Sequence, residues 1–223
     1  VEVLAHELGH RLVIAQADDA AFDAAYPGVS PHHLAIDLAA RAMFGGPHHL
    51  DGLSFFPHAD GYQHVVTYGM SSLYVDEDSF GGEHSGWGYE MTAKVRADGP
   101  EDATWMANSL ANLARYTWTS KRWFEPYQSI NGGGQPLRVD SDTALTSYLV
   151  VPDTTVSAVT TVHGRLDFLQ FVGITQAEVD WLSADPLQAT DRGQELAAAI
   201  AADGNPHLVT DLARAHSYRG DRP

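Results

Sequence analysis

The stretch Tyr89 to Val95 (YEMTAKV) constrains the fold most strongly, because apolar and polar residues alternate along it. One side of such a strand carries Tyr89, Met91, Ala93 and Val95, and the other carries Glu90, Thr92 and Lys94. This alternation is typical of an antiparallel sheet that buries one face and leaves the other in water. We therefore predict a half-buried strand whose polar side is exposed to solvent.

Further stretches have the composition of strands. His64 to Tyr68 (HVVTY) is rich in β-branched residues, and Leu166 to Val172 is apolar on both sides, which favours a central position in the sheet. Shorter apolar runs predict additional strands at Leu53 to Phe56, Thr146 to Val151 and Leu208 to Leu212 (LVTDL).

Helical patterns lie before, between and after these strands. The alanine-rich stretch Ala15 to Ala25 predicts one helix, and Thr104 to Ser120 predicts another with apolar residues along one side. Asp191 to Ala202 predicts a third helix, with Asp191 as its N-cap and Gly204 as its stop signal.

The sharpest local signal lies at Thr175. Its side chain can accept a hydrogen bond from the backbone of Glu178, and the Glu178 side chain can reach back to the backbone of Thr175. Ile174 and Val179 occupy the positions of a hydrophobic staple. We predict that a helix begins here.

The order of the predicted elements shows no regular strand–helix–strand alternation. This order predicts an α+β fold, with a mixed and largely antiparallel sheet flanked by helices. The chain has 223 residues, and we find neither an internal repeat nor a shift in composition that would mark a linker, so we expect a single domain.

The charge balance limits the classes of partner. The chain has 13 basic and 29 acidic residues, a formal net charge of −16, which argues against nucleic acid and anionic membranes and favours basic partners. No apolar run approaches the roughly 20 residues of a membrane helix. The first residues include Glu2 and Glu7, which do not suit a signal peptide, and cysteine is absent, so we expect a cytoplasmic protein.

The stretch His6-Glu7-Leu8-Gly9-His10 has the H-E-x-x-H spacing of zinc peptidases. In that arrangement His6 and His10 bind the metal, and Glu7 is the general base for the metal-bound water. The extended pattern fails, because Val13 and Gln16 stand where a glycine and a third histidine are required. A third ligand could still come from an aspartate between residues 18 and 23 or from a distant histidine, so a zinc metallopeptidase remains the alternative.

No other catalytic motif appears. The chain lacks a G-x-S-x-G nucleophile elbow, a G-x-x-x-x-G-K-[ST] phosphate loop and a strand followed by G-x-G-x-x-G. The motifs therefore give only thin support for an enzyme.

Six blocks of the sequence together resemble the suppressor of fused (SUFU) family, in the family's order. They are Gly45-Gly46-Pro47 with Leu50-Asp51-Gly52-Leu53-Ser54, His64 to Tyr74 (HVVTYGMSSLY), Ser85 to Thr92 (SGWGYEMT), Leu113-Ala114-Arg115-Tyr116, Gly164 with Phe168 to Thr175 (FLQFVGIT), and Leu208 to Leu212. The resemblance divides the chain into an N-terminal extension (1–14), a SUFU-like domain (15–217) and a polar tail (218–223).

The resemblance implies an α+β protein-binding domain with no cofactor and no established catalytic residue. Animal members bind a short peptide, partly by adding it as a strand to a sheet edge. A chain of this size resembles the single-domain bacterial members, which are regarded as candidate immunity proteins of polymorphic toxin systems. Tyr116 corresponds to a tyrosine near the peptide-binding edge, and Gln128 stands where the family has an acidic residue.

The acidic loop at Asp76, Glu77 and Asp78 gives a separate reason to expect a basic partner, because complementary charge accelerates encounter. Three hypotheses follow. The favoured one is a binding protein of the SUFU type that acts as an immunity protein and blocks a basic toxin. The others are a regulatory or signalling interaction domain and the zinc metallopeptidase.

Overall fold

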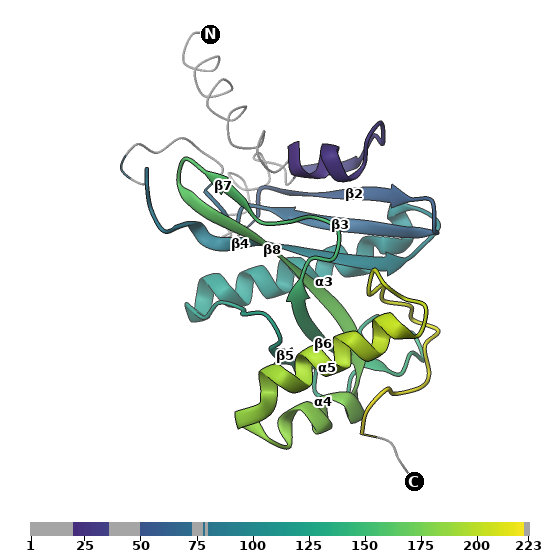
Figure 1. The fold of residues 1–223 in the computed structure, drawn as a ribbon. Coiled ribbons are helices and arrows are strands. Elements are labelled where there is room, and N and C mark those ends of the chain that lie inside the picture. Colours follow the sequence, from purple (N-terminus) through teal and green to yellow (C-terminus); the bar gives the residue numbers. More distant parts are fainter. Residues whose placement is uncertain (1–19, 36–49, 73–77, 79, 221–223) are drawn as a thin grey trace.

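The computed structural model describes residues 20–35, 50–72, 78 and 80–220 of the chain. Their centre is one eight-stranded mixed sheet (Figure 1). The strands are β1 (His32–Ala35), β2 (Gly52–His58), β3 (Tyr62–Tyr68), β4 (His84–Arg96), β5 (Ser129–Ile130), β6 (Leu145–Pro152), β7 (Val159–Thr161) and β8 (Gly164–Thr175). Helices pack on the sheet, which confirms the predicted α+β class and single domain.

The strand order is β1-β2-β3-β4-β8-β6-β5, with β7 paired to β8 beside this path. Every strand pair is antiparallel except β4–β8, which is parallel. The prediction of a mixed, largely antiparallel sheet is therefore confirmed. β8 lies between β4 and β6, as its apolar character on both sides indicated.

Helix α3 (Pro100–Ser120) covers one face of the sheet. It begins at Pro100 rather than at the predicted Thr104, because a proline suits the first helical turn and the acidic residues after it favour the positive end of the helix dipole. Met106 and Leu110 are fully buried against the strands. The helix ends at Lys121, whose left-handed conformation (φ 58°) lets its amide bond to the Thr117 carbonyl.

The opposite face of the sheet is buried too, so the prediction of a solvent-exposed polar side of β4 is wrong. Glu90, Thr92 and Lys94 each have 0% exposed surface. Two apolar clusters cover this face. One contains Phe22 and Tyr26, from the helical residues 20–25 and the bend that follows, and the other packs under the C-terminal helices.

Thr92 pairs with Gln170 of β8, between the two clusters, whereas Glu90 pairs with Phe168 of the first cluster. Along β8, Phe168 belongs to the first cluster, Val172 belongs to the second, and the buried Gln170 lies between them. The alternation of Tyr89 to Val95 therefore reflects two buried faces, one apolar and one polar. It does not reflect one buried face and one solvent-exposed face. Figure 1 shows the helical residues 20–25 and the C-terminal helices toward opposite ends of the sheet.

Helix α4 (Gln176–Ser183) begins with the predicted capping box. The Thr175 hydroxyl accepts from the Glu178 amide at 3.3 Å, and the Glu178 carboxylate accepts from the Thr175 amide at 2.8 Å. The staple residues Ile174 and Val179 are buried. These contacts confirm the local prediction.

Helix α5 (Ala189–Ala202) follows the 3₁₀ turn η2 (Pro186–Gln188) directly, and its N-cap is Gln188. The prediction of Asp191 as the cap is therefore wrong. Asp191 lies in the first turn, because the chain enters α5 from a turn that Asp185 already caps. Gly204 adopts φ +79° just after the helix, as a stop residue does.

The segment Leu208 to Leu212 does not form the predicted strand. Only Thr210 makes a bridge, with Val95, because Leu208 adopts a left-handed conformation (φ 51°) that breaks the extended backbone. The Thr210 amide donates to the Lys94 carbonyl at 2.7 Å, and its carbonyl accepts from the Arg96 amide at 2.9 Å. The segment therefore fastens to the end of β4 through one residue.

Candidate functional site

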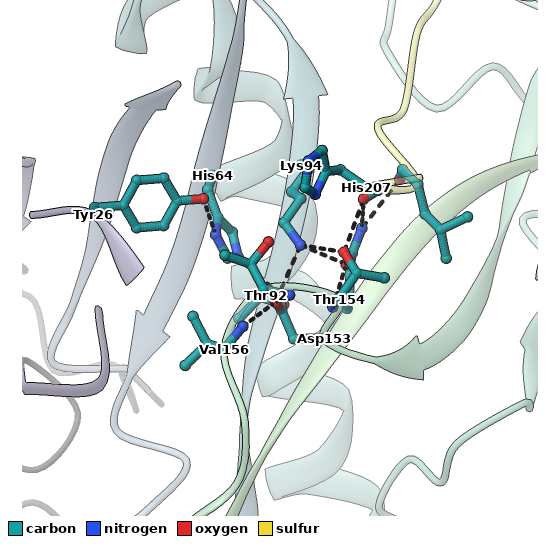
Figure 2. A network of polar contacts seen from close by, with 11 residues as sticks. Tyr26, His64, Thr92, Lys94, Asp153, Thr154, Val156 and His207 are labelled. Carbon is teal, nitrogen blue, oxygen red and sulfur yellow. Dashed lines mark hydrogen bonds and ion pairs between the residues drawn. The ribbon is translucent and has the colours of Figure 1, made fainter. Parts of the chain in front are cut away.

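A cluster of charged side chains lies inside the domain, between the two apolar clusters (Figure 2). His64 on β3 and Lys94 on β4 are direct cross-strand neighbours, and Asp153 follows the end of β6. The Asp153 carboxylate accepts from Lys94 Nζ at 3.1 Å and from His64 Nε2 at 2.9 Å. None of these three side chains has exposed surface.

The geometry defines the protonation states. Burial opposes ionisation of Asp153, but His64, Lys94 and the Thr92 hydroxyl together hold the pKa of its carboxyl well below the usual range. Burial also lowers the pKa of His64, more than Asp153 raises it, so His64 is neutral. Because its Nε2 donates to Asp153, its Nδ1 accepts from the Tyr26 hydroxyl at 2.7 Å.

The lysine extends this network to the C-terminal segment. Lys94 Nζ donates to the Thr154 hydroxyl at 2.6 Å and to Gln170 Oε1 at 3.0 Å. The Gln170 amide group in turn donates to the backbone carbonyls of His207 and Leu208. The network therefore ties β3, β4, β8 and the chain after α5 together.

Tyr26, His64 and Asp153 form a hydrogen-bonded series, as the groups of a hydrolase relay do. Tyr26 is only 4% exposed and His64 is fully buried, so a substrate cannot reach the tyrosine oxygen without opening the domain. The cluster therefore links distant parts of the chain inside the fold.

Large aromatic side chains gather near the C-terminal end of α3 and in the segment after it. We call Trp87, Tyr116, Trp118, Trp123 and Phe124 the aromatic face. Tyr116 is 43% exposed and Trp123 is 57% exposed, whereas Phe124 between them is buried. The Tyr116 ring stacks on the Phe124 ring with their centroids 5.9 Å apart. Phe124 therefore joins the exposed rings to the core.

A groove adjoins the aromatic face. Its volume is about 620 Å³, and its lining includes Trp87, Tyr89, Trp123 and Phe124. The groove lies where the β4–β8 pairing is irregular, since the register changes between His84 and Tyr89. Polar groups at this groove include the exposed ion pair of Arg165 and Asp167, with N···O 2.7 Å.

Gln128 lies next to the same segment. Its amide group bonds to Glu125 twice, accepting from the backbone amide at 3.1 Å and donating to the carboxylate at 3.2 Å. The next two residues form β5, which ends the strand order and, within the described part of the chain, pairs only with β6. It is therefore an edge strand of the described sheet, and both of its residues are half-buried.

Two of the predicted site residues contact the segment that follows α3. Tyr116 contacts Phe124 and Gln128 contacts Glu125, so both border the same segment. Asp78 is exposed. Asp76 and Glu77 lie outside the described residues, as do His6, Glu7 and His10 of the candidate zinc site.

Sequence analysis missed Trp123 and Phe124. The adjacent tryptophan and phenylalanine soon after the predicted helix 104–120 were a usable signal, because two large aromatic residues outside an amphipathic pattern favour a binding surface. No such signal existed for Asp153, whose role depends on residues distant in the sequence.

The described helices include none with the length and apolar composition needed to cross a membrane. The family model of the suppressor of fused protein matches residues 46–215. The chain belongs to the suppressor of fused family. The suppressor of fused homologs of human and mouse are each 30% identical over 203 residues, an alignment that covers 85% of this chain and 40% of theirs. The chain thus spans less than half the length of these relatives.

Solved SUFU structures share the fold. The crystal structure of the Sufu–Fu complex contains a chain with a TM-score of 0.74 and 22% identity, and the match covers 92% of each chain. A SUFU homolog from Neisseria gonorrhoeae has a TM-score of 0.60 and 15% identity, with 94% of this chain and 98% of that chain covered.

Proposed function

We propose that this SUFU domain is a non-enzymatic binding domain that holds a partner protein on the aromatic face and along the outer edge of β5. The observation that carries this proposal is the exposure of two large rings, Tyr116 in α3 and Trp123 in the segment that leads from α3 to the edge strand β5. The Sufu–Fu complex supports it, because a related chain of known structure assembles with a protein.

The chemistry of this surface suits a peptide segment. Tryptophan and tyrosine are enriched among residues that dominate binding energy, because their rings bury a large area at a low cost in entropy. The Tyr116 ring stacks on Phe124, which restricts its motion before binding and so reduces the entropy cost further. An extended partner segment can pair with the backbone of β5 while its side chains lie against the rings.

The partner that we propose is a basic toxin, with this chain as the bacterial, cytoplasmic immunity protein that occupies the toxin's surface. The net charge of −16 supports a basic partner, and the acidic residues Asp76, Glu77 and Asp78 would contribute to its attraction. A regulatory or signalling partner is the second candidate, and the similarity to the suppressor of fused homologs of human and mouse favours it.

Photo-crosslinking tests the surface. A photoreactive amino acid placed at Trp123 should capture a defined partner in the native host, and the same amino acid at Leu187, which is 97% exposed, serves as the matched control. With the partner purified, Trp123→Ala and Tyr116→Ala should each weaken binding about 30-fold, the factor that corresponds to a loss of roughly 2 kcal/mol. Unchanged affinity in both variants would exclude the aromatic face.

Two further measurements separate the candidate functions. Where the gene for this chain has a toxin gene beside it, co-expression of the two should restore growth if the chain is an immunity protein, whereas rescue should fail for a signalling domain. The zinc metallopeptidase makes a different prediction: peptidase activity and bound zinc that are both lost in His6→Ala with His10→Ala. That outcome would overturn the proposed function.

A further inference from the structure

The β2–β3 hairpin presents two metal-ligating side chains at its tip. Its loop is Ala59-Asp60-Gly61, which joins the cross-strand pair His58 and Tyr62. Gly61 adopts φ +74°, and its amide donates to the His58 carbonyl at 3.0 Å, as in a three-residue hairpin loop with a left-handed last residue. This turn places the Asp60 carboxylate oxygen 3.5 Å from His58 Nδ1.

The chain after α5 brings a third ligand to the same place. One ring nitrogen of His207, one of His58 and one carboxylate oxygen of Asp60 all lie within 4.8 Å of one another. Four-coordinate zinc with bonds near 2.0–2.1 Å separates its ligand atoms by about 3.3 Å. The His58–Asp60 spacing already matches this value, and the Asp60 side chain, 68% exposed, is free of packing that would stop it from adjusting.

The surroundings hold both imidazole rings in place. The buried Tyr62 ring stacks on His58 with centroids 4.3 Å apart, and it contacts the His207 ring at 5.9 Å. The His207 carbonyl is fixed separately by the Gln170 side chain. The site is therefore supported before any ion binds.

One nitrogen of His207 has no other use. Among the described residues, His207 Nδ1 is buried without a hydrogen-bond partner. A buried polar atom of this kind costs free energy unless it finds a partner or a ligand. On His58, the Nδ1 lone pair receives only a contact of 3.1 Å from the exposed Asp60 amide, which water can replace.

We propose that His58, Asp60 and His207 bind a divalent transition-metal ion of the zinc class. Two imidazoles and one carboxylate suit zinc, cobalt or nickel, whereas magnesium and calcium prefer oxygen ligands throughout. The exposed side of the site leaves the fourth position to water. The ion would join the hairpin tip to the segment that carries Thr210 and would stabilise that junction.

The local charges agree with a bound cation. Two positive groups lie nearby, and each has an acidic partner. The Asp153 carboxylate neutralises Lys94 at 3.1 Å, and Arg96, which donates to the carbonyls of Asp60 and Gly61, lies 3.9 Å from the Asp211 carboxylate.

The test uses the full chain without a histidine tag and zinc chloride as the probe. Equilibrium dialysis with elemental analysis should find one tight zinc ion per chain, and His58→Ala and His207→Ala should each weaken its binding at least about tenfold. His216→Ala is the matched control, because His216 forms an exposed pair with Asp203 at 3.7 Å on the same part of the chain. Its affinity should not change.

Two measurements distinguish zinc binding at this site from loss of folding and from zinc binding by other histidines. Circular dichroism should show His207→Ala folded, since that residue contributes to the buried network through its backbone carbonyl. Zinc should raise the melting temperature of the parent protein and not that of His58→Ala. Zinc that is absent from the parent protein, retained in both site variants, or lost only in His6→Ala with His10→Ala would overturn the proposal.

Discussion

Replacement of Lys94 by methionine tests the account of the buried network. Methionine keeps the length and most of the volume of the side chain but removes the cation. Asp153 then loses the 3.1 Å bond to Lys94 Nζ in a site where neither side chain has exposed surface. The Thr154 hydroxyl and Gln170 Oε1 lose the same donor, at 2.6 and 3.0 Å.

The magnitude follows from the burial. Removing one partner of a buried ion pair leaves an uncompensated charge and costs about 3–5 kcal/mol. For a domain of this size, each kcal/mol lowers the melting temperature by about 2–4 °C, so we expect a decrease of roughly 6–20 °C. Replacing Asp153 by asparagine in the Lys94→Met background should recover part of this loss, because the unpaired charge is then gone.

Thermal and urea unfolding followed by circular dichroism measure the effect. Arg165→Met is the matched control, since Arg165 also forms an ion pair, with Asp167 at 2.7 Å, but its side chain is 61% exposed. That control should cost less than about 1 kcal/mol. If Lys94→Met is no more costly than Arg165→Met, water reaches Lys94 and the network is not closed.

Three further predictions concern the described interior. Unfolding free energy should fall as the pH drops below 6.5, by up to about 1.4 kcal/mol per pH unit, because burial lowers the pKa of His64 and only the unfolded chain then takes up the proton. Urea titrations at pH 7 and pH 5 should show a smaller difference for His64→Gln. Thr175→Ala should cost about 1 kcal/mol through the lost N-cap. Glu178→Gln should cost more in the same assay, because Glu178 also binds Arg214 at 2.7 Å.

Local signals in the sequence were reliable where a few neighbouring residues decide the structure. The capping box at Thr175 needs only Glu178, which lies in the next turn, so its pattern is complete within the sequence window. The central position of β8 was likewise predictable, because a strand that is apolar on both sides must be covered on both. Leu208 shows the limit, since one left-handed residue ended a pattern that read as a strand.

The buried polar face could not be predicted, because distant residues decide it. Lys94 and Asp153 are 59 positions apart in the sequence, and His64 and Tyr26 are 38 positions apart. The alternation of apolar and polar residues predicts a strand, but it does not predict which elements cover the polar face of that strand. Tyr116 and Gln128 were found through resemblance to a family, whereas Trp123 emerged only when the exposed surface was known.

The pairing inside the domain also determines where the charge of the molecule acts. Asp153 is neutralised by Lys94, and Glu178 is neutralised by Arg214. Burial raises the pKa of Glu90, which removes at most one further negative charge. The two ion pairs are neutral as pairs, so they leave the formal net charge of −16 unchanged.

Net charge and aromatic contacts should therefore control different steps of binding. The charge sets the rate of association, and the ring contacts set the lifetime of the complex. Surface charge accelerates approach of a basic partner and is screened over about 10 Å at 0.1 M salt, whereas ring contacts at Tyr116 and Trp123 are short-ranged. Added salt should therefore slow association and leave dissociation nearly unchanged, while loss of the Trp123 ring should speed dissociation. A partner whose association is independent of salt would remove the reason to regard the acidic surface as part of the recognition.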